Sequence, residues 1–338
     1  MKKIDFEAHF YTETYLKTLS KNKGYPRLEL DEKNKSRRLW SAEDMEQPVS
    51  DPLFDSLLDH GEGRLRRMDA SGVDVQILSL SAPGIEQLDP MVGTALAKET
   101  NNTLSEVVHR HPDRFMGFAV LAPKRPREAA DELERCVKDL GFVGWNTHAN
   151  YGDSYLDEKQ YRPILERAEK LNVPIYLHPT LSTYSPMKTY GFPLAGPPFG
   201  FGFEVLLCLM RMIYSGIFDE FPRLVVILGH LGEGFPFLME RVDWAYLRPF
   251  DPNLRPIISK KPSEYLRSNI FVTTSGNYYE PAFRCTCEAL GIDRILLGTD
   301  YPYEEMDPCM HFLQRINLSD QEKDKIYYLN AKRIGIAS

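Results

Sequence analysis

The chain alternates short apolar runs with segments whose apolar positions recur at helical spacing. Each run is rich in Val, Ile, Leu and Phe and ends at a polar or turn-forming residue, which is typical of strands buried on both faces of a sheet. The predicted strands cover residues 3–9, 73–80, 115–121, 142–146, 173–178, 224–230, 269–274 and 294–300. Segments with apolar positions every three or four residues separate most of them and predict amphipathic helices. These helices cover residues 61–70, 91–111, 127–140, 158–171, 203–215, 236–246, 281–290, 307–315 and 319–334.

This alternation predicts the fold class. Strands that lead into helices form a parallel sheet with helical crossovers, and eight such units favour a closed α/β barrel of the (β/α)8 TIM type. An open doubly wound sheet is the structural alternative, but the chain lacks a glycine-rich phosphate-binding turn after its first strand. Its 338 residues suffice for one barrel with insertions, so we expect a single domain over residues 1–338.

One long stretch, residues 11–59, interrupts the alternation after the first strand. Its charges are mixed and its periodicity is weak, which predicts an insertion of loop with short helices. A connection of this length inside a compact domain is usually functional or mobile, so the insertion is a candidate lid. Arg37, Arg38 and Trp40 are its candidate contacts to a ligand, and the sequence does not choose among them.

Composition narrows the classes of function. The net charge is -7 and no basic stripe with interleaved aromatic residues is present, which argues against a nucleic-acid partner. We expect no membrane segment, because no apolar run approaches the roughly 20 residues of a membrane helix. The start of the chain does not resemble a secretory signal, so a soluble cytoplasmic protein is expected. The five cysteines should be reduced, and Cys285 and Cys287 lack the partners of a zinc site.

Acidic and imidazole side chains lie at or just past the ends of several predicted strands. Glu7 and His9 belong to the first strand, and His178, His230 and Asp300 belong to the fifth, sixth and eighth. Residues two apart in a strand point to the same face, so Glu7 and His9 can bind one ion together. Because the carboxyl ends of barrel strands meet on one side and form the active site, the joint pattern predicts a metal centre.

A divalent ion suits this set of side chains. Two imidazoles and two carboxylates hold a borderline ion at about 2.0 to 2.2 Å and leave positions open for water or substrate. Taken alone, His178 or His230 is better explained as an ordinary core histidine, and only the joint pattern favours a metal centre. Open coordination positions are typical of catalytic rather than structural sites.

Several motifs resemble those of a known family. They are Glu7-Ala-His9, Tyr-Leu-His-Pro at His178, Leu-Gly-His-Leu-Gly-Glu-Gly over 228–234, Thr-Ser-Gly-Asn over 274–277 and Thr-Asp-Tyr-Pro at Asp300. With them the chain resembles, over nearly its full length, the amidohydrolase-superfamily branch of metal-dependent decarboxylases that includes aminocarboxymuconate semialdehyde decarboxylase. It is most similar to the γ-resorcylate, 2,3-dihydroxybenzoate and 5-carboxyvanillate decarboxylases, and segments 199–204, 217–222 and 301–303 are closest to the last. The motifs are specific for the branch and less so for the substrate.

The resemblance implies an amidohydrolase-like barrel with one divalent ion, manganese or zinc, in each subunit. Four residues would hold the ion: Glu7, His9, His178 and Asp300. His230 would handle protons, with Glu233 orienting it, so that Asp300, His230 and Glu233 form the predicted catalytic set. Arg241 would contact the aromatic acid, since a planar guanidinium suits a carboxylate or phenolate. The alternative for Arg241 is a solvated helix arginine that pairs with Glu240 or Asp243.

Aromatic residues near the motifs predict the lining of a pocket. Phe201 and Tyr301 are the predicted substrate contacts within the aromatic segments 199–203 and 301–303. Such residues are equally common in core packing.

Two departures from the family pattern are informative. Hydrolytic members begin with His-x-His, whereas Glu7 replaces the first histidine here. Members with two metals carry a carboxylated lysine after the fourth strand, and residues 144–149 contain no lysine, so a single ion is expected. The carboxyvanillate enzyme lacks a histidine matching His9, so metal binding should be more like that of the resorcylate enzymes. His148 lies at the same strand end and stays unassigned.

The predicted reaction is a non-oxidative decarboxylation, the work of a carboxy-lyase, on a 2-hydroxybenzoate-type aromatic acid. The carboxylate and phenolate of the acid would chelate the metal, and a protonated Asp300 would deliver its proton to the ring carbon that bears the carboxylate. The alternative is a mononuclear metal-dependent hydrolase of a lactone, ester or amide, with His230 or Asp300 as base. The particular acid, the metal and the oligomeric state stay open, although relatives commonly form homodimers or homotetramers.

Overall fold

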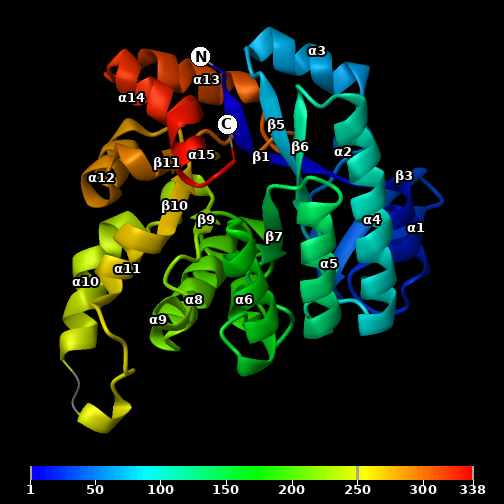
Figure 1. The fold of residues 1–338 in the computed structure, drawn as a ribbon. Coiled ribbons are helices and arrows are strands. Elements are labelled where there is room, and N and C mark those ends of the chain that lie inside the picture. The colour runs from blue at the N-terminus through cyan, green and yellow to red at the C-terminus, as the bar shows by residue number, and fades with distance from the viewer. Residues whose placement is uncertain (1, 249–250, 337–338) are drawn as a thin grey trace.

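A computed structural model describes residues 2–248 and 251–336, and a sheet of eight parallel strands forms its centre (Figure 1). The strands follow one another around the sheet in chain order. They are β1 (Ile4–Phe10), β5 (Val75–Leu80), β6 (Phe115–Ala119), β7 (Gly144–His148), β8 (Ile175–His178), β9 (Val226–Leu228), β10 (Ile270–Thr273) and β11 (Ile295–Leu296). All eight predicted strand regions are therefore confirmed.

Hydrogen bonds between the first and last strand regions close the barrel. The Phe6 N–H donates to the carbonyl of Leu297 at 2.8 Å, and the His9 N–H donates to that of Tyr301 at 2.7 Å. The Asp300 N–H donates back to the carbonyl of Glu7 at 2.9 Å. The predicted (β/α)8 TIM barrel is confirmed, and its closure brings Glu7 and Asp300 together although they lie near opposite ends of the sequence.

Helices cover the outside of the barrel (Figure 1). The longer ones are α3 (Glu62–Ser71), α4 (Pro90–Arg110), α5 (Pro126–Lys138), α6 (Arg162–Leu171), α8 (Gly200–Tyr214), α10 (Phe235–Leu247), α12 (Glu280–Leu290) and α13 (Met306–Arg315). Shorter ones are α7 (Phe192–Ala195), α9 (Ile217–Glu220), α11 (Pro262–Asn269), α14 (Asp320–Asp324) and α15 (Asn330–Arg333). The single helix expected over 319–334 is broken by a π-helical turn, and α11, which lies in a proline-containing connection, was not predicted.

Apolar side chains from alternate strand positions fill one end of the barrel. One buried cluster takes members from every strand except β7: Ile4, Phe6, Val75, Ile77, Phe118, Tyr176, Ile227, Phe271 and Leu296. Residues near the end of the described chain, Ala331, Ile334 and Ile336, pack onto the same cluster. The inward-facing polar residues Glu7, His9 and His178 lie toward the carboxyl ends of their strands, where barrel enzymes place their active sites.

The insertion after β1 differs from the expected loop with short helices. It consists of α1 (Glu13–Lys21), α2 (Asp51–Leu58) and, between them, a three-stranded antiparallel sheet. The strands of this sheet are β2 (Arg27–Asp31), β3 (Ser36–Ala42) and β4 (Met45–Gln47). The expected short helices are therefore present, but the sheet was not predicted, because its strands carry many charged side chains and contain no continuous apolar run.

The predicted ligand contacts of the insertion stabilise the insertion itself. Arg37 forms ion pairs with Asp51 and Asp55, each at 2.6 Å. Arg38 pairs with Glu46 at 2.6 Å, and its guanidinium lies 4.7 Å from the centre of the Trp40 ring. None of the three predicted side chains, Arg37, Arg38 and Trp40, lines the cavity described below.

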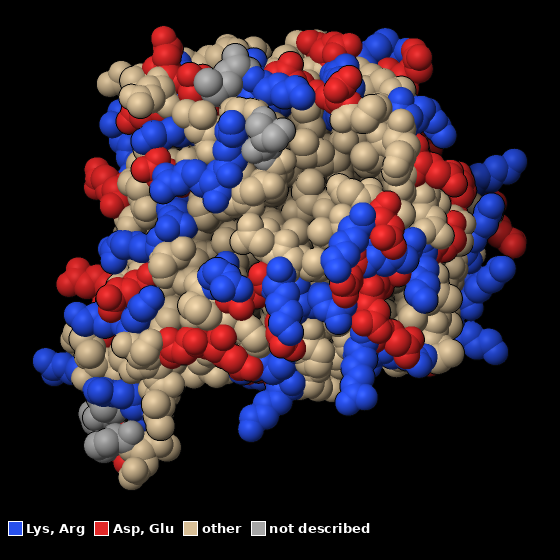
Figure 2. Space-filling model, viewed as in Figure 1, with Lys and Arg blue, Asp and Glu red and all other residues tan. Residues whose placement is uncertain are grey.

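The surface charges and the apolar helices bear on the expectations that the protein binds neither nucleic acid nor a membrane. Lys and Arg side chains are interspersed with Asp and Glu over the face shown in Figure 2. The stretch Phe192–Tyr214 is long and apolar enough to cross a membrane by length and composition alone, which corrects the expectation that no such stretch exists. In the fold, α8 packs onto the hydrophobic core through Val205, Leu209 and Met212, as the core helix of a globular protein does.

Candidate active site

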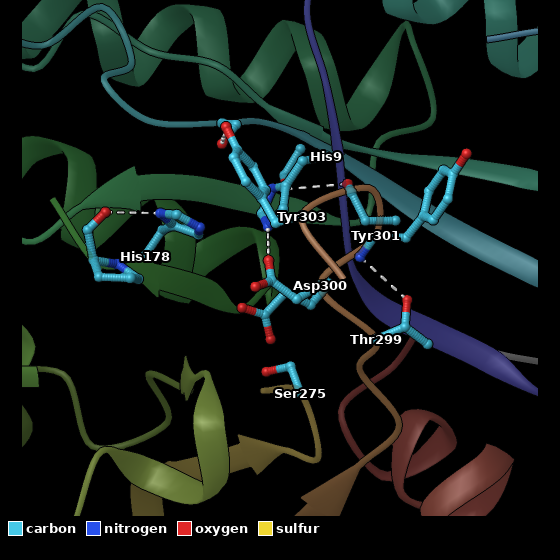
Figure 3. A network of polar contacts seen from close by, with 12 residues as sticks. His9, His178, Ser275, Thr299, Asp300, Tyr301 and Tyr303 are labelled. Carbon is cyan, nitrogen blue, oxygen red and sulfur yellow. Dashed lines mark hydrogen bonds and ion pairs between the residues drawn. The ribbon is translucent and has the colours of Figure 1, made fainter. Parts of the chain in front are cut away.

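The four predicted metal ligands lie together at the carboxyl ends of the strands. Figure 3 shows His9, His178 and Asp300 of this group. One ligand atom from each of Glu7, His9, His178 and Asp300 lies within 4.8 Å of the others. The sequence suggested positions at or past strand ends, but Glu7 and His9 lie inside β1, because that strand pairs with β5 as far as Phe10. Their side chains are fully buried inside the barrel.

The predicted ligand histidines, His9 and His178, both use Nδ1 for protein partners, which leaves Nε2 available to an ion. His178 Nδ1 lies 2.8 Å from the carbonyl of Pro179, and His9 Nδ1 lies 3.0 Å from Ser79 Oγ. His9 Nε2 is 3.1 Å from Asp300 Oδ1. Burial, and then the neighbouring imidazoles, hold the pKa of His178 well below its usual value. His178 is therefore neutral, which is the form that binds a metal.

The donor set fits one divalent ion. Glu7 Oε2 accepts a hydrogen bond from Thr273 Oγ1 at 2.7 Å. Among the described residues, Glu7 Oε1 is buried without a hydrogen-bond partner, and His9 Nε2 is buried with only the ion-pair contact to Asp300 Oδ1. Buried polar atoms of this kind are rare in folded proteins and mark places where a ligand binds. Two imidazole nitrogens and two carboxylates are suitable donors for manganese or zinc.

His230 lies beside this cluster, in the turn after β9. Its Nε2 is 3.6 Å from Glu7 Oε1 and 3.9 Å from Glu233 Oε1, and its Nδ1 is 3.3 Å from Ser275 Oγ. Burial alone would lower the pKa of His230, but the carboxylates of Glu7, Glu233 and Asp300 raise it to about 9. Burial raises the pKa of Glu233 to about 7. The structure thus brings Glu233 close to His230, at a distance longer than a hydrogen bond.

The backbone around His230 is strained. His230, Leu231 and Glu233 have φ angles of 53°, 58° and 54°, and Asp300 has 63°. Non-glycine residues in this left-handed region cluster at functional sites, where the surrounding structure holds them. Gly276 has a φ of 61°, and a Cβ there would lie 2.5 Å from His230 Nδ1. Only glycine fits beside His230, which gives the Thr-Ser-Gly-Asn motif a steric reason.

Asp5 fixes the two strand ends that carry Glu7 and Asp300. Its Oδ1 accepts the N–H groups of Glu7 at 3.1 Å and of Thr299 at 2.9 Å. Its Oδ2 accepts Thr299 Oγ1 at 2.6 Å and Gln76 Nε2 at 3.0 Å. Burial raises the pKa of Asp5 to about 6, against the effect of these donors. All four contacts suit an ionised carboxylate, so Asp5 holds β1 against the segment before Asp300.

Replacing Asp5 with asparagine is expected to weaken manganese binding by about 10- to 100-fold, as substitutions behind metal ligands do. An amide offers one acceptor where the carboxylate offers two, so the positions of Glu7 and Asp300 relax. Manganese affinity of the metal-free proteins, measured by competition with a chelating dye, tests this. Asp74→Asn is the matched control, because Asp74 accepts the N–H of Lys3 at the opposite end of β1. Equal affinities in the two variants would contradict the prediction.

A cavity of about 360 Å³ opens from the ligand cluster. The insertion contributes Gln47, Pro48 and Leu53 to it, so these residues, rather than Arg37, Arg38 or Trp40, reach the pocket. Polar and charged side chains of the barrel loops form part of its wall: Ser81, His178, His230, Glu233, Asp300, Tyr303 and Glu304. The remaining wall is apolar and consists of Ala82, Pro179, Phe192, Pro197, Gly276 and Phe201.

Of the two predicted aromatic substrate contacts, one lies in the cavity and the other lies in the core. Phe201 lines the cavity, as expected. Tyr301 is only 1% exposed and points away from the ligand cluster (Figure 3), with the Arg64 guanidinium 4.9 Å from its ring centre. Tyr303 enters the cavity instead, with its ring 5.7 Å from that of His9. From the sequence, Tyr301 and Tyr303 both lie close to Asp300. Only the direction of the backbone after Asp300 decides that Tyr303, and not Tyr301, enters the cavity.

Arg241 does not line the cavity of its own chain. It lies exposed on α10, and its guanidinium is 4.2 Å from the centre of the Trp244 ring. Of its two suggested partners, Asp243 accepts hydrogen bonds from the backbone and hydroxyl of Ser263 at 2.9 and 2.6 Å. The structure therefore shows Arg241 stacked on an aromatic ring at the surface.

His148, which the sequence left unassigned, lies beside His178. Its Nδ1 is 2.9 Å from Glu86 Oε1, and its ring is 5.2 Å from that of His178. Both members of the pair are buried. The sequence did not indicate Glu86 as the partner of His148, because Glu86 lies in the loop after β5, far from any motif.

Comparisons with known proteins agree with this geometry. The sequence profile described as Amidohydrolase matches residues 4–334. The chain is 39% identical over 291 residues to γ-resorcylate decarboxylase of Rhizobium sp. (strain MTP-10005), and the match covers 82% of this chain and 88% of the relative.

Two solved structures are similar over nearly their whole length. One is a 5-carboxyvanillate decarboxylase from Novosphingobium aromaticivorans with manganese and 4-hydroxy-3-methoxy-5-nitrobenzoic acid (TM-score 0.87, 30% identity, 98% of this chain and 95% of that chain). The other is a dihydroxybenzoic acid decarboxylase from Polaromonas sp. JS666 with manganese and the inhibitor 2-nitroresorcinol (TM-score 0.83, 34% identity, 98% and 96%). The manganese in both structures agrees with the donor set found in this chain. The chain belongs to the amidohydrolase family and is similar over most of its length to the aromatic-acid decarboxylases within it.

Proposed function

We propose that this protein is a carboxy-lyase that removes CO2, without oxidation, from a hydroxylated aromatic acid whose carboxylate lies next to a hydroxyl. One observation carries the proposal: the cluster of Glu7, His9, His178 and Asp300 opens directly into a partly apolar cavity. The similarity to decarboxylases that bind manganese supports it. Glu7, His9, His178 and Asp300 would hold a divalent ion, manganese or zinc, which would supply Lewis-acid chemistry for the oxygens of the acid.

The apolar wall suits a flat ring. Phe192, Phe201 and the prolines of the wall give the ring surfaces against which to pack and exclude water from its faces. The acidic end of the cavity then receives the oxygen substituents. In this proposed arrangement the carboxylate-bearing carbon would lie beside Asp300.

Asp300 is the proposed proton donor. In its protonated form it transfers the proton to the ring carbon that bears the carboxylate. The bond between that carbon and the carboxylate then breaks, its electron pair returns to the ring, and CO2 leaves. The ring regains its aromaticity, and Asp300 is left as a carboxylate that must be protonated again.

His230 and Glu233 are the proposed source of that proton. His230 lines the same cavity, and the surrounding carboxylates hold it protonated because they raise its pKa to about 9. Glu233, with a pKa raised by burial to about 7, exchanges protons near neutral pH. Both groups can therefore restore Asp300 between turnovers.

Product analysis tests the reaction. The manganese-loaded protein, incubated with a panel of hydroxylated benzoates that includes 2,6-dihydroxybenzoate, is expected to release CO2 and the matching phenol. In deuterium oxide the phenol should carry one deuterium at the former carboxylate position. Hydrolysis of a lactone, ester or amide with incorporation of labelled water oxygen, and no CO2 from any acid, would favour the hydrolase instead.

We further propose that copies of the chain associate as a homodimer or homotetramer and work in the cytoplasm. Exposed apolar side chains gather on α10 and the segment after it, where Phe237 is 83%, Leu254 80% and Ile257 97% exposed. Apolar exposure on this scale is typical of an association surface. Light scattering of the protein at micromolar concentration measures the assembly, and a monomer would contradict it.

The proposed cytoplasmic location is supported by the five cysteines, which are unpaired, as suits a reducing compartment.

A further inference from the structure

Arg64 is a buried charged residue that the ligand cluster and the cavity wall do not account for. It lies in the first turn of α3 and is fully buried. Burial lowers the pKa of Arg64 to about 10, so it stays protonated at neutral pH. The hydrogen bonds of its guanidinium go to three backbone carbonyls and one side-chain amide. An arginine is rarely fully buried unless its charge is paired, so the choice of these acceptors needs an explanation.

Two nitrogens of the guanidinium join the insertion to the first barrel strand. Nε donates to the carbonyl of Asp59 at 2.8 Å, and Nη2 donates to the carbonyls of Ser56 at 3.2 Å and of His9 at 2.7 Å. Ser56 lies in the last turn of α2 and Asp59 follows that helix, where carbonyls have no partner inside the helix. Arg64 therefore satisfies the end of α2 and binds it to the backbone of a predicted metal ligand.

The rest of the guanidinium reaches the strand end that carries Asp300. Its carbon Cζ lies 4.9 Å from the centre of the Tyr301 ring, and Tyr301 directly follows Asp300. Nη1 donates to Gln76 Oε1 at 3.4 Å, and Gln76 Nε2 in turn donates to Asp5 Oδ2 at 3.0 Å. Arg64 thus contacts β1, the loop after β11 and the insertion, which are the segments that meet where the barrel closes.

The insertion that Arg64 holds also forms part of the cavity wall. Leu53 of α2 lines the cavity, and Gln47 and Pro48, which line it as well, lie just before the same helix. At the other end of these contacts, His9 belongs to the ligand cluster. Arg64 therefore lies between a ligand of the proposed ion and one wall of the cavity.

We infer that Arg64 is a positioning residue that ties the insertion to the metal centre, so that the insertion becomes ordered when the ion binds. Once an ion holds His9 and Asp300, the two segments beside Arg64 are fixed, and its planar guanidinium then fixes α2. The cavity wall at Leu53 is complete only in the loaded protein, so the ion binds before the aromatic acid. By the same coupling, loosening Arg64 weakens metal binding. This inference rests on the proposed function, whose metal centre it uses.

Hydrogen exchange of the unaltered full-length protein measures this ordering. Manganese is expected to slow deuterium uptake in residues 51–58 of α2 by about threefold or more, because local opening of α2 breaks the contacts with Arg64. Uptake in residues 126–138 of α5, which take part in none of these contacts, is the reference within the same sample and should change less.

Arg64→Lys removes the planar fork and keeps the positive charge. An ammonium group cannot serve the acceptors in α2, His9 and Gln76 together. Manganese affinity, measured by competition with a chelating dye, should therefore fall about 10- to 100-fold, as it does when groups behind metal ligands are removed. Manganese should also no longer slow exchange in α2.

Arg67→Lys is the matched control. Arg67 lies one turn further along α3, with its guanidinium 6.0 Å from the centre of the same Tyr301 ring, but it pairs with Glu305 at the surface. This substitution makes the same chemical change without touching His9 or the insertion. It should alter neither the manganese affinity nor the exchange of α2.

The possible results separate a positioning role from support of the fold alone. The inference is overturned if manganese fails to bind the unaltered protein, or binds without slowing exchange in α2 more than in α5. It is also overturned if Arg64→Lys lowers the midpoint of thermal unfolding but leaves manganese affinity and the manganese-dependent exchange unchanged. If this variant does not fold, the comparison of α2 with α5 in the unaltered protein still decides.

CO2 release from 2,6-dihydroxybenzoate, measured on the same preparation, tests the proposed function separately. The expected exchange and affinity results without CO2 from any acid support the inference and overturn the decarboxylase. Release of CO2 without manganese-dependent protection of α2 leaves the decarboxylase intact and overturns the role of Arg64.

Discussion

Replacing Asp300 with asparagine is expected to slow decarboxylation by about 10²- to 10⁴-fold, the range that a general acid contributes. Asparagine keeps an oxygen where Asp300 approaches His9 Nε2 at 3.1 Å, but it has no acidic proton to give to the ring. Glu7, His9 and His178 remain as ligands, so the variant should still bind manganese. CO2 release from 2,6-dihydroxybenzoate and metal content, measured on one sample, separate the loss of a proton donor from the loss of a ligand.

Glu304→Gln is the matched control for this experiment. Glu304 lines the same cavity, and its N–H donates to the carbonyl of Asp300 at 3.1 Å, but it does not belong to the ligand cluster. Removing its charge alters the cavity without removing the proposed donor, so turnover should fall by less than about tenfold, within what a single nearby charge contributes. Normal manganese content with full turnover in the Asp300 variant would refute the role of Asp300 as the acid.

The barrel could be predicted because its strands are buried on both faces. Segments such as 175–178 and 226–228 are short and largely apolar, and proline or glycine follows each of them, so their type follows from composition. The positions of the metal ligands could be predicted for the same reason, since each is a polar residue that interrupts or ends an apolar run. The motifs shared with a known family then indicated which of these polar residues act together.

Other parts of the site depend on contacts between distant segments. The strands of the antiparallel sheet of residues 27–47 carry many charged and polar residues, so they lack the continuous apolar runs that identified the barrel strands. Nothing local distinguishes Gln47 as the residue that reaches the cavity, because its position follows from how the whole insertion packs onto the barrel. Likewise, the direction of the backbone after Asp300, with a φ of 63°, sends Tyr301 to the core and Tyr303 to the cavity.

Asp5 is another residue whose role could not be predicted from the sequence. Its position in an apolar strand marks it as unusual, but its hydrogen bonds join residues 5 and 7 to residue 76 on the paired strand and to residue 299, which only barrel closure brings near. A sequence pattern can therefore indicate the ligands of a metal and still give no sign of the groups that hold them in place.

Removal of the metal with a chelator is expected to abolish CO2 release and to lower the midpoint of thermal unfolding, and added manganese should restore both. An ion that binds only the folded chain stabilises it by RT ln(1 + [L]/Kd), which is about 4 kcal/mol when the free ion exceeds Kd a thousandfold. Without the ion, two carboxylates and two imidazoles face one another inside the barrel, with Glu7 Oε1 buried and unpartnered among the described residues.

Glu7→Gln tests whether manganese stabilises the fold by binding at the proposed centre. The substituted side chain lacks the charge that binds the ion, so manganese should no longer raise the unfolding midpoint. The metal-free variant should still fold, because an amide can accept the hydrogen bond from Thr273 Oγ1. Differential scanning calorimetry of both proteins, with and without manganese, makes the comparison. An equal rise of the midpoint in the variant would mean that manganese stabilises the fold from some other site, and the cluster around Glu7 would then lose its assignment as the metal centre.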